Sequence, residues 1–532
     1  MRGLLLVTVL LLISFLGLNH GLWTPDEPRE AEIAREMSVA PGIIPTLGGQ
    51  RFLEKPPLYY WVVAATYRLA GAPSPLAARL VSACAGALTV LALFFWGWQA
   101  HSRTAGLLAA TMLATSVQFV ISVHWILIDP LLMLFTTLAA WCAWLLLSGC
   151  DSNRLRAGLY AALALALWIK GLIGPVLVCS GVAAYSLIDR AARPRLLRPI
   201  WGLAVMAAAL VLLALGLWRQ GGTAALWEWG YVNHVERALN PSAQLGHRQP
   251  LLYYFWTLPM ALLPWLAPFI DALAHAKGSA RGWRGFGREP DLRRYCMILC
   301  AAMFLVLSLS ATKRETYLLP LLPPLFLWLG VHLAQRWRTD AAALRASVLW
   351  WPQLALVALL LLAPPLYVYW RFMPGDTAAA ALSIMAAALC MAMLYASVRS
   401  AAQAAAAWLL AGALAAIASA LLLAPHALDA TKNMAPFLRA VDQELPPGAP
   451  VYATDVDETL EALVPFVTGR TLIALASPQL PVPALSQLPE WILVQNNHNG
   501  RAFAPPPDYV LARSQAFGPG RTLALWHRGP QR

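Results

Sequence analysis

The sequence predicts a polytopic α-helical membrane protein of about thirteen transmembrane helices that ends in a small α/β domain. Three observations predict this fold class. Of the 532 residues, 59% are hydrophobic and only 12% are charged, whereas soluble domains carry about 25% charged residues. Apolar stretches of about 20 residues, long enough to cross a bilayer, recur along most of the chain. The Arg and Lys residues behind the net charge of +13 gather in alternate short loops, which indicates a positive-inside topology and argues against nucleic acid as a partner.

The apolar stretches follow one another from the first residues to residue 424, and we assign residues 1–424 to a transmembrane domain. Arg2 and the apolar run after it resemble a secretory signal, but no small-residue cleavage site follows. Residues 1–18 are therefore predicted to be an uncleaved first span. The spans are expected at residues 4–20, 76–98, 104–122, 126–147, 156–170, 172–188, 199–218, 251–270, 295–312, 317–334, 347–370, 378–397 and 403–424.

The loops between the spans predict the orientation of the chain. Residues 189–199, 274–294 and 334–345 are strongly basic and are expected in the cytoplasm, together with the N-terminus. An odd number of spans then puts the first loop, residues 20–75, and the C-terminus on the external face. All seven cysteines lie in predicted spans or at cytoplasmic edges, so no disulfide framework is expected.

Residues 425–532 differ in character from the rest of the chain. KNMAPFLRAVDQEL predicts a helix, and five short apolar runs bounded by Pro, Gly and Asn predict strands. The strands are expected in PGAPVYATDVDE, RTLIALAS, WILVQNN, YVLARSQAF and TLALWHR. Because the segment contains neither a nucleotide-binding loop nor a nucleophile elbow, a module for packing or partner docking is the favoured interpretation.

The first external loop has a high density of charge, in TPDEPREAEIAREM and RFLEKPPLYYW. Charge beside a membrane is costly unless it is paired or used, so this loop is predicted to carry a polar site. TPDEPREAEIAREM is typical of a helix that lies on the membrane surface, and its charges from Glu30 to Glu36 are interpreted as ordinary surface charges, paired or solvated. Asp26 precedes that helix, where its residue type fits a helix cap and a catalytic acid equally well.

Two further pairs of charges lie near the external edge of the predicted spans. Glu54 and Lys55 precede two prolines, which end any regular element and fix the preceding backbone in an extended form. Asp129 and Lys170 are an isolated acid and an isolated base at matching depth, so we expect them to neutralise each other. A purely structural ion pair would explain them; a pair that faces a cavity would also position a third carboxylate or a phosphate.

Cationic side chains also recur at the external edge, against the positive-inside bias. They are His234, Arg237, His247 and Arg248 in one loop, and Lys313 and Arg314, followed by Tyr317, in another. Phosphate is the natural partner of such groups, because the Arg fork and the Lys point charge both match it. The alternative is that these side chains extend to lipid headgroups.

In order, DEPREAEIAREM, EKPPLYYW, the Asp at the outer end of the fourth span, WIKG and KRETYLLP resemble the bacterial lipid A aminoarabinose transferases. These belong to the GT-C superfamily of polyprenyl-phosphate-dependent glycosyltransferases, which also holds the protein mannosyltransferases. The resemblance covers the whole chain and implies the GT-C fold. It implies a sugar donor on undecaprenyl phosphate, an envelope acceptor with lipid A as the first candidate, and a site on the periplasmic face of the bacterial inner membrane.

The resemblance also implies roles for individual residues. Asp26 matches the acid at the centre of the family site, and Asp129 with Lys170 matches its supporting ion pair. Contacts with the donor phosphate are implied for Arg29, Lys55, Arg237 and Tyr317, to which the cationic edge adds Lys313 and Arg314. Glu54 corresponds to a carboxylate that can hold a divalent metal in the family, with His426 as a second ligand.

This chain departs from the family at two positions: Glu30 and Phe52 stand where the family has an aromatic residue and a hydroxyl-bearing one. The departures concern the sugar and the acceptor more than the chemistry. The reaction expected is inverting transfer by direct displacement, with Asp26 as general base if the acceptor is a hydroxyl. Three alternatives stay open: O-glycosylation of protein or another glycan, transport of a lipid-linked sugar, and a sensor or scaffold that acts through the C-terminal domain.

Overall fold

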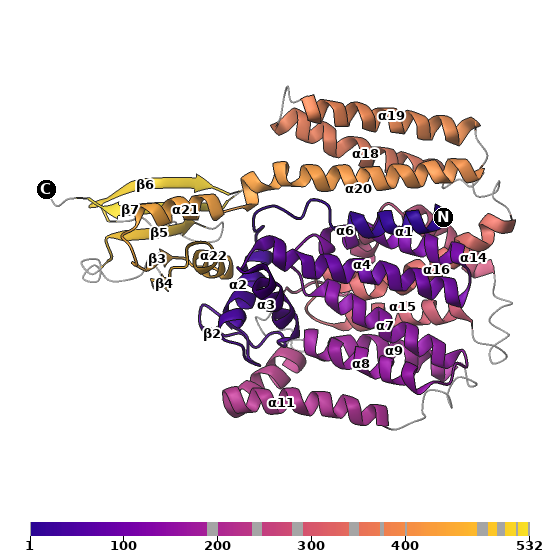
Figure 1. Ribbon diagram of the computed structural model, residues 1–532, viewed down its shortest axis with the longest axis horizontal. Helices are drawn as coiled ribbons and strands as arrows, with labels where there is room; N and C mark the ends of the chain where they lie inside the picture. The colour runs from indigo at the N-terminus through magenta and orange to yellow at the C-terminus, as the bar shows by residue number, and fades with distance from the viewer. Residues whose placement is uncertain are drawn as a thin grey trace. The chain divides into compact units, whose positions relative to one another are not determined.

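The computed structural model describes residues 2–188, 201–236, 247–278, 291–339, 350–372, 377–399, 402–475, 488–496, 506–517 and 520–529. The chain forms two compact units (Figure 1). The helical unit consists of Met1–Leu18, Leu53–Tyr59 and Arg79–Leu423. The mixed unit consists of Asn19–Phe52, Tyr60–Ala78 and Ala424–Arg532, so it contains most of the charged first loop as well as the C-terminal segment.

The helical unit is built from long helices, most of which run roughly parallel to one another in Figure 1. They are α1 (Arg2–Ile13), α4 (Pro75–Ala100), α5 (Arg103–Ala114), α6 (Val117–Val123), α7 (Asp129–Leu147), α8 (Asn153–Lys170), α9 (Ile173–Ile188), α11 (Trp201–Trp227), α13 (Tyr253–Ala261), α14 (Leu266–Gly278), α15 (Leu292–Leu309), α16 (Leu322–Thr339), α18 (Trp350–Phe372), α19 (Thr377–Arg399) and α20 (Ala402–Lys432). A π-helical segment, η1 (Glu228–Glu236), follows α11, and a 3-10 segment, η3 (Glu315–Leu321), precedes α16.

The helices confirm a multi-pass membrane protein but not the predicted count of thirteen spans. Every predicted stretch contains helix, yet among the described residues seven helices are long and apolar enough to cross a bilayer. The number rises to nine if α5 with α6, bent by 65°, and α13 with α14, bent by 115°, each form one span. Others are short for a bilayer: α1 has 12 residues and α9 has 16.

The two bends contact each other inside the helical unit. The N–H of Val117, after the first bend, donates to the carbonyl of Leu263 at 2.8 Å. Trp265 Nε1 donates to the hydroxyl of Thr115 at 2.9 Å. Pro264 has no N–H to continue a helix. The second bend therefore supplies the acceptor for the Val117 N–H, as an apolar environment requires, and a side-chain hydrogen bond adds a second link between the two bends.

Glycines allow α4, α5 and α16 to approach closely. A Cβ on Gly106 of α5 would lie 2.3 Å from the carbonyl oxygen of Phe94 on α4, and a Cβ on Gly330 of α16 would lie 2.7 Å from the carbonyl of Ala105. Small residues at helix contacts are the usual way for membrane helices to pack backbone against backbone.

The mixed unit contains a five-stranded sheet, which confirms the predicted α/β domain. Its elements are α2 (Asp26–Val39), β1 (Thr46–Leu47), β2 (Gln50–Arg51), most of α3 (Leu58–Ala70), α21 (Ala435–Glu444), β3 (Val451–Thr454), α22 (Glu458–Thr468), β4 (Leu472–Ala474), β5 (Trp491–Asn496), β6 (Tyr509–Ala516) and β7 (Thr522–Arg528). The strand order is β4-β3-β5-β7-β6, with β3 parallel to β4 and β5 and the other pairs antiparallel. All five strands and α21 lie where the sequence predicts them; α22 was not predicted.

Candidate active site

A cavity of about 460 Å³ lies in the helical unit, and its lining contains both polar and apolar residues. The polar lining residues are Glu54, Lys55, Asp129, Lys170, Asn233, His234, Ser310, Thr312 and Tyr317. The apolar ones are Leu132, Leu172, Ile173, Val176, Leu177, Val235, Val306, Leu307, Leu309 and Pro320. The cavity thus offers charged groups together with apolar side chains suited to a hydrocarbon chain.

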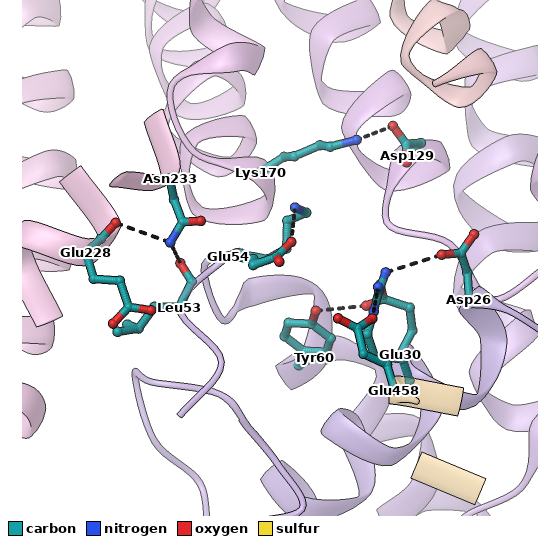
Figure 2. Close-up of polar contacts among 12 residues, drawn as sticks. Asp26, Glu30, Leu53, Glu54, Tyr60, Asp129, Lys170, Glu228, Asn233 and Glu458 are labelled. Atoms are coloured by element: carbon teal, nitrogen blue, oxygen red, sulfur yellow. Dashed lines mark hydrogen bonds and ion pairs between the residues drawn. The ribbon is translucent and has the colours of Figure 1, made fainter. Parts of the chain in front are cut away.

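The ion pair between Asp129 and Lys170 forms part of the polar lining (Figure 2). Lys170 Nζ lies 2.5 Å from Asp129 Oδ1, and the two side chains are 9% and 8% exposed. Asp129 is the first residue of α7 and Lys170 the last of α8, so each charge also opposes the partial charge of its own helix end. The predicted pairing is confirmed, and the pair faces a cavity.

Tyr317 contributes a second contact to Lys170. It lies in η3, which packs against α7, and the ammonium of Lys170 stands 4.1 Å from the centre of its ring. The cation is therefore held between a carboxylate and an aromatic face, each of which lowers the cost of its burial.

Glu54 and Lys55 bring a second carboxylate and a second ammonium to the same lining. Lys55 Nζ lies 3.6 Å from Glu54 Oε2, and their side chains are 16% and 35% exposed. The segment that carries them is tied to η1, because Asn233 Nδ2 donates to the carbonyl of Leu53 at 3.2 Å (Figure 2). The sequence did not single out Asn233, since nothing in its pattern predicted a π-helix there.

The predicted metal ligands do not form a group in the part of the chain that the structure describes. The His426 side chain is outside the described residues, and Glu54 belongs to no set of three or more potential ligands there. The one such set, Asp271, His275 and His332, has Arg336 Nη1 at 2.6 and 2.8 Å from the two Asp271 oxygens. A guanidinium already stands where a cation would bind, so this cluster is a hydrogen-bonded ion pair between α14 and α16.

The KRETYLLP segment, residues 313–320, contributes Tyr317 to the cavity, whereas its two cations, Lys313 and Arg314, are not among the described lining residues. Lys313 is 3% exposed, and its ammonium donates to the carbonyls of Ser310, at 2.5 Å, and Gln249, at 3.2 Å. Its burial lowers the pKa of Lys313. Arg314 is half-buried and does not line the cavity either, and Arg237 lies outside the described residues.

In the mixed unit, the guanidinium of Arg29 pairs with three acids, which Figure 2 labels. Its guanidinium lies 3.3 Å from Asp26, 2.9 Å from Glu30 and 2.8 Å from Glu458 of α22. Tyr60 donates to Glu30 at 2.8 Å. Burial alone would lower the pKa of Arg29, but Glu30 and Asp26, followed by Glu458, outweigh it and raise that pKa.

The interpretation of α2 as a helix with ordinary surface charges is wrong. Glu27, Glu30 and Glu32 are 0%, 3% and 0% exposed. Glu30 pairs with Arg29, whereas Arg35 pairs with Glu32. The reason is that α22 packs against α2, and its residues are more than 400 positions away, beyond the reach of any local pattern.

The structure also refines the position of Asp26. It is the first residue of α2, and Pro25 takes the capping position before it. Asp26 and Arg29 belong to the mixed unit, whereas Lys55, Asp129 and Lys170 belong to the helical unit. The convergence of Asp26 with the cavity residues thus stays a prediction.

The chain is similar to known glycosyltransferases in sequence. The family described as dolichyl-phosphate-mannose-protein mannosyltransferase matches residues 1–228. The undecaprenyl phosphate-alpha-4-amino-4-deoxy-L-arabinose arabinosyl transferase of Pseudomonas aeruginosa (strain UCBPP-PA14) is 32% identical over 373 residues, which is 66% of this chain and 64% of that protein. The protein of the same name from Edwardsiella ictaluri (strain 93-146) is 31% identical over 335 residues, 61% of this chain and 58% of that one. The matched region spans less than two thirds of these relatives.

The fold is similar over nearly its full length to a solved structure. The crystal structure of ArnT from Cupriavidus metallidurans bound to undecaprenyl phosphate aligns with a TM-score of 0.75 over 98% of this chain and 97% of that one, at 19% sequence identity. The helices, the sheet domain and the sequence matches agree with the predicted resemblance to the aminoarabinose transferases, and the chain has the fold of this solved transferase structure.

Proposed function

We propose that the protein is an inverting membrane glycosyltransferase that moves a sugar from a polyprenyl phosphate to an envelope acceptor. The observation that carries this proposal is the cavity, whose lining combines Lys55 and Lys170 with Asp129, Tyr317 and a larger set of apolar side chains. A polyprenyl phosphate needs both kinds of surface, cations for its phosphate and an apolar wall for its chain.

The chemistry proposed is displacement at the anomeric carbon, with the polyprenyl phosphate as leaving group. As the bond breaks, negative charge grows on the phosphate, and Lys55 and Lys170 are placed to stabilise it. Asp129 and Glu54 keep the net charge of the lining near neutral before the donor arrives and so limit the cost of burying two cations.

Asp26 and Arg29 are proposed to act on the acceptor side and on the donor phosphate, as the resemblance implies. If the acceptor is a hydroxyl, Asp26 serves as general base; if it is a lipid A phosphate, the nucleophile is already ionised and Asp26 orients it. Tyr317, Arg237, Lys313 and Arg314 complete the proposed set of donor-phosphate residues. A metal on Glu54 is left out of the steps, because the described residues provide that carboxylate with no group of ligands.

The names of the relatives suggest 4-amino-4-deoxy-L-arabinose as the sugar and undecaprenyl phosphate as the carrier. Lipid A as the acceptor is implied by the resemblance of the sequence motifs to the aminoarabinose transferases. The charge of the loops supports a bacterial inner-membrane protein with a cytoplasmic N-terminus and a periplasmic C-terminus. The match of residues 1–228 to protein mannosyltransferases supports one alternative, O-glycosylation of a protein.

The test compares envelope lipids and proteins by mass spectrometry in cells with the wild-type chain, with no chain, and with the double variant Asp129→Asn/Lys170→Met. Changing both members avoids an unpaired buried charge, which by itself costs about 3–5 kcal/mol. We expect a sugar increment on lipid A with the wild type only, and an increment on a protein would favour the alternative. Arg154→Met, at the exposed opposite end of α8, is the matched control and should retain activity. Full transfer by the double variant would contradict the proposal.

A further inference from the structure

His234 lies at the corner where the chain turns out of α8. Its Nε2 atom is 3.3 Å from the backbone N–H of Leu172, and its Nδ1 atom is 2.6 Å from the carbonyl of Trp229. A carbonyl only accepts hydrogen bonds, so Nδ1 carries the proton and Nε2 is the acceptor for Leu172. Both ring nitrogens are used to hold backbone.

The corner itself is built around the imidazole. Gly171 has a φ of +72°, which glycine adopts without strain, and a Cβ there would lie 2.2 Å from His234 Nε2. The ring thus packs directly on the peptide that follows Lys170. The corner fixes the backbone next to Lys170. The position of the Lys170 Cα in turn limits where its Nζ atom can lie relative to Asp129.

Asn233, which precedes His234, holds the backbone of the segment that carries Lys55. Its Nδ2 donates to the carbonyl of Leu53, two residues before Lys55, and to the carbonyl of Glu228, both at 3.2 Å. In η1, Asn233 and His234 each bond a carbonyl five residues earlier and reach outward to one lysine-bearing segment (Figure 2 draws Asn233). Two consecutive side chains therefore connect the segments of Lys55 and Lys170 through one short π-helix.

We propose that Asn233 and His234 are positioning residues that fix the separation of Lys55 and Lys170 in the cavity lining. The inference rests on the proposed function, because it assigns these two lysines to one phosphate. The π-helix is the means: its two successive side chains, Asn233 and His234, bond two different segments, and π-helical turns are frequent at functional sites. A displacement of either lysine by about 1 Å is enough to weaken a site of this kind strongly.

The experiment measures the thermal stabilisation of the full-length protein in detergent by undecaprenyl phosphate over a range of concentrations. His234→Phe keeps a ring but loses the acceptor; His234→Gln keeps an acceptor that can meet Leu172. Asn233→Leu keeps the volume and loses both donated hydrogen bonds. We expect the concentration for half-maximal stabilisation to rise at least about tenfold with Phe and Leu and to be largely restored with Gln.

The control is Tyr231→Phe in the same π-helix, whose exposed ring stacks on Trp227 away from the cavity lining. It should match the wild type. Wild-type affinity in both His234→Phe and Asn233→Leu would overturn the inference while leaving the proposed function intact. A wild-type protein that undecaprenyl phosphate does not stabilise would instead overturn the proposed donor. His234→Phe and Asn233→Leu disturb different segments of the chain. If one of these variants fails to fold, the affinity of the other for undecaprenyl phosphate still tests the inference.

Discussion

Glu32 is a carboxylate with no exposed surface in the middle of α2. Arg35 holds it with Nε and Nη2, each 2.6 Å from one of its oxygens. Burial raises the pKa of Glu32 to about 7, and the hydrogen bonds from Arg35 keep it from rising further. A carboxyl whose pKa is higher in the folded than in the unfolded chain stabilises the fold below the unfolded value and loses that contribution as the pH rises.

The variant Glu32→Gln should therefore change the pH dependence of stability. In the wild type, the contribution of Glu32 is complete below about pH 4.5 and is lost by about pH 7, a difference of about 3 kcal/mol. Glutamine does not titrate, so the melting temperature of the variant relative to the wild type should be higher at pH 8 than at pH 5. The measurement is thermal unfolding in detergent at both values. An equal difference between the two proteins at pH 5 and pH 8 would show that Glu32 titrates normally.

The sequence predicts single residues best where a charged side chain is isolated in an apolar stretch. Asp129 and Lys170 were isolated charges at matching depth, and they pair as expected. Asn233 carries no such signal, because an Asn in a polar loop is ordinary until a π-helix aims it at a particular carbonyl. The burial of the acids of α2 could not be predicted from the sequence, because α22, which packs against α2, lies more than 400 positions away.

Among the elements, the contact of α5 with α4 and α16 depends on glycine. Gly106 faces backbone atoms, the carbonyl of Phe94 at 2.3 Å and the N of Trp98 at 2.9 Å from a Cβ placed there. Backbone cannot move aside as the end of a flexible side chain can. The helices must separate if a side chain is added.

Gly106→Ala should for this reason destabilise the helical unit by about 1–3 kcal/mol. Gly158→Ala in α8 is the control, since its Cβ would meet only the Cys142 Sγ atom, at 3.3 Å, and alanine favours a helix. The measurement is the melting temperature of both variants in detergent. If Gly106→Ala is as stable as Gly158→Ala, then α4 and α5 can move apart at little cost and the argument from close packing is wrong.

The hydrophobicity of the sequence predicts where the helices lie, but it does not predict where they break. The stretch at 104–122 is predicted as one span, yet α5 and α6 meet at 65°. The N–H of Val117 finds its acceptor on Leu263, and the hydroxyl of Thr115 accepts from Trp265. Such partners come from tertiary structure. Hydropathy measures the total length of an apolar run and carries no information on where it bends.

In the whole molecule, the first loop and the C-terminal segment fold together as one mixed unit. Arg29 and Glu458 are 2.8 Å apart in space and 429 positions apart in the chain. Gly48 is similarly close to α22, where a Cβ would lie 2.7 Å from Glu461. The candidate residues Asp26 and Arg29 are thus supported by a domain that was first interpreted as a packing or docking module.

A chain that ends at residue 430 should lose transfer activity, because α22 and the sheet no longer cover the buried acids of α2. Full transfer activity without this domain would count against a sensor or scaffold that acts through it. The measurement is lipid A mass in cells that express the truncated chain, with its membrane level checked by immunoblotting. Glu458→Gln is the mild control; its exposed carboxylate should matter by less than about 1 kcal/mol, and activity should persist. Full activity of the truncated chain would show that the sheet domain is dispensable.

Among the groups that the structure describes, the Nε atom of Arg29 is an unsatisfied hydrogen-bond donor in the unliganded protein. Its Nε–H is shielded from water and, within the described residues, has no acceptor, although three acids surround the rest of the guanidinium. An unmet donor of this kind costs about 1–3 kcal/mol. A guest oxygen that reached it would relieve that penalty, and an uncharged one, such as a hydroxyl of a sugar, would do so without repulsion from the neighbouring acids. Part of the binding free energy for such a substrate would then come from removing the cost of this unsatisfied donor in the unliganded protein.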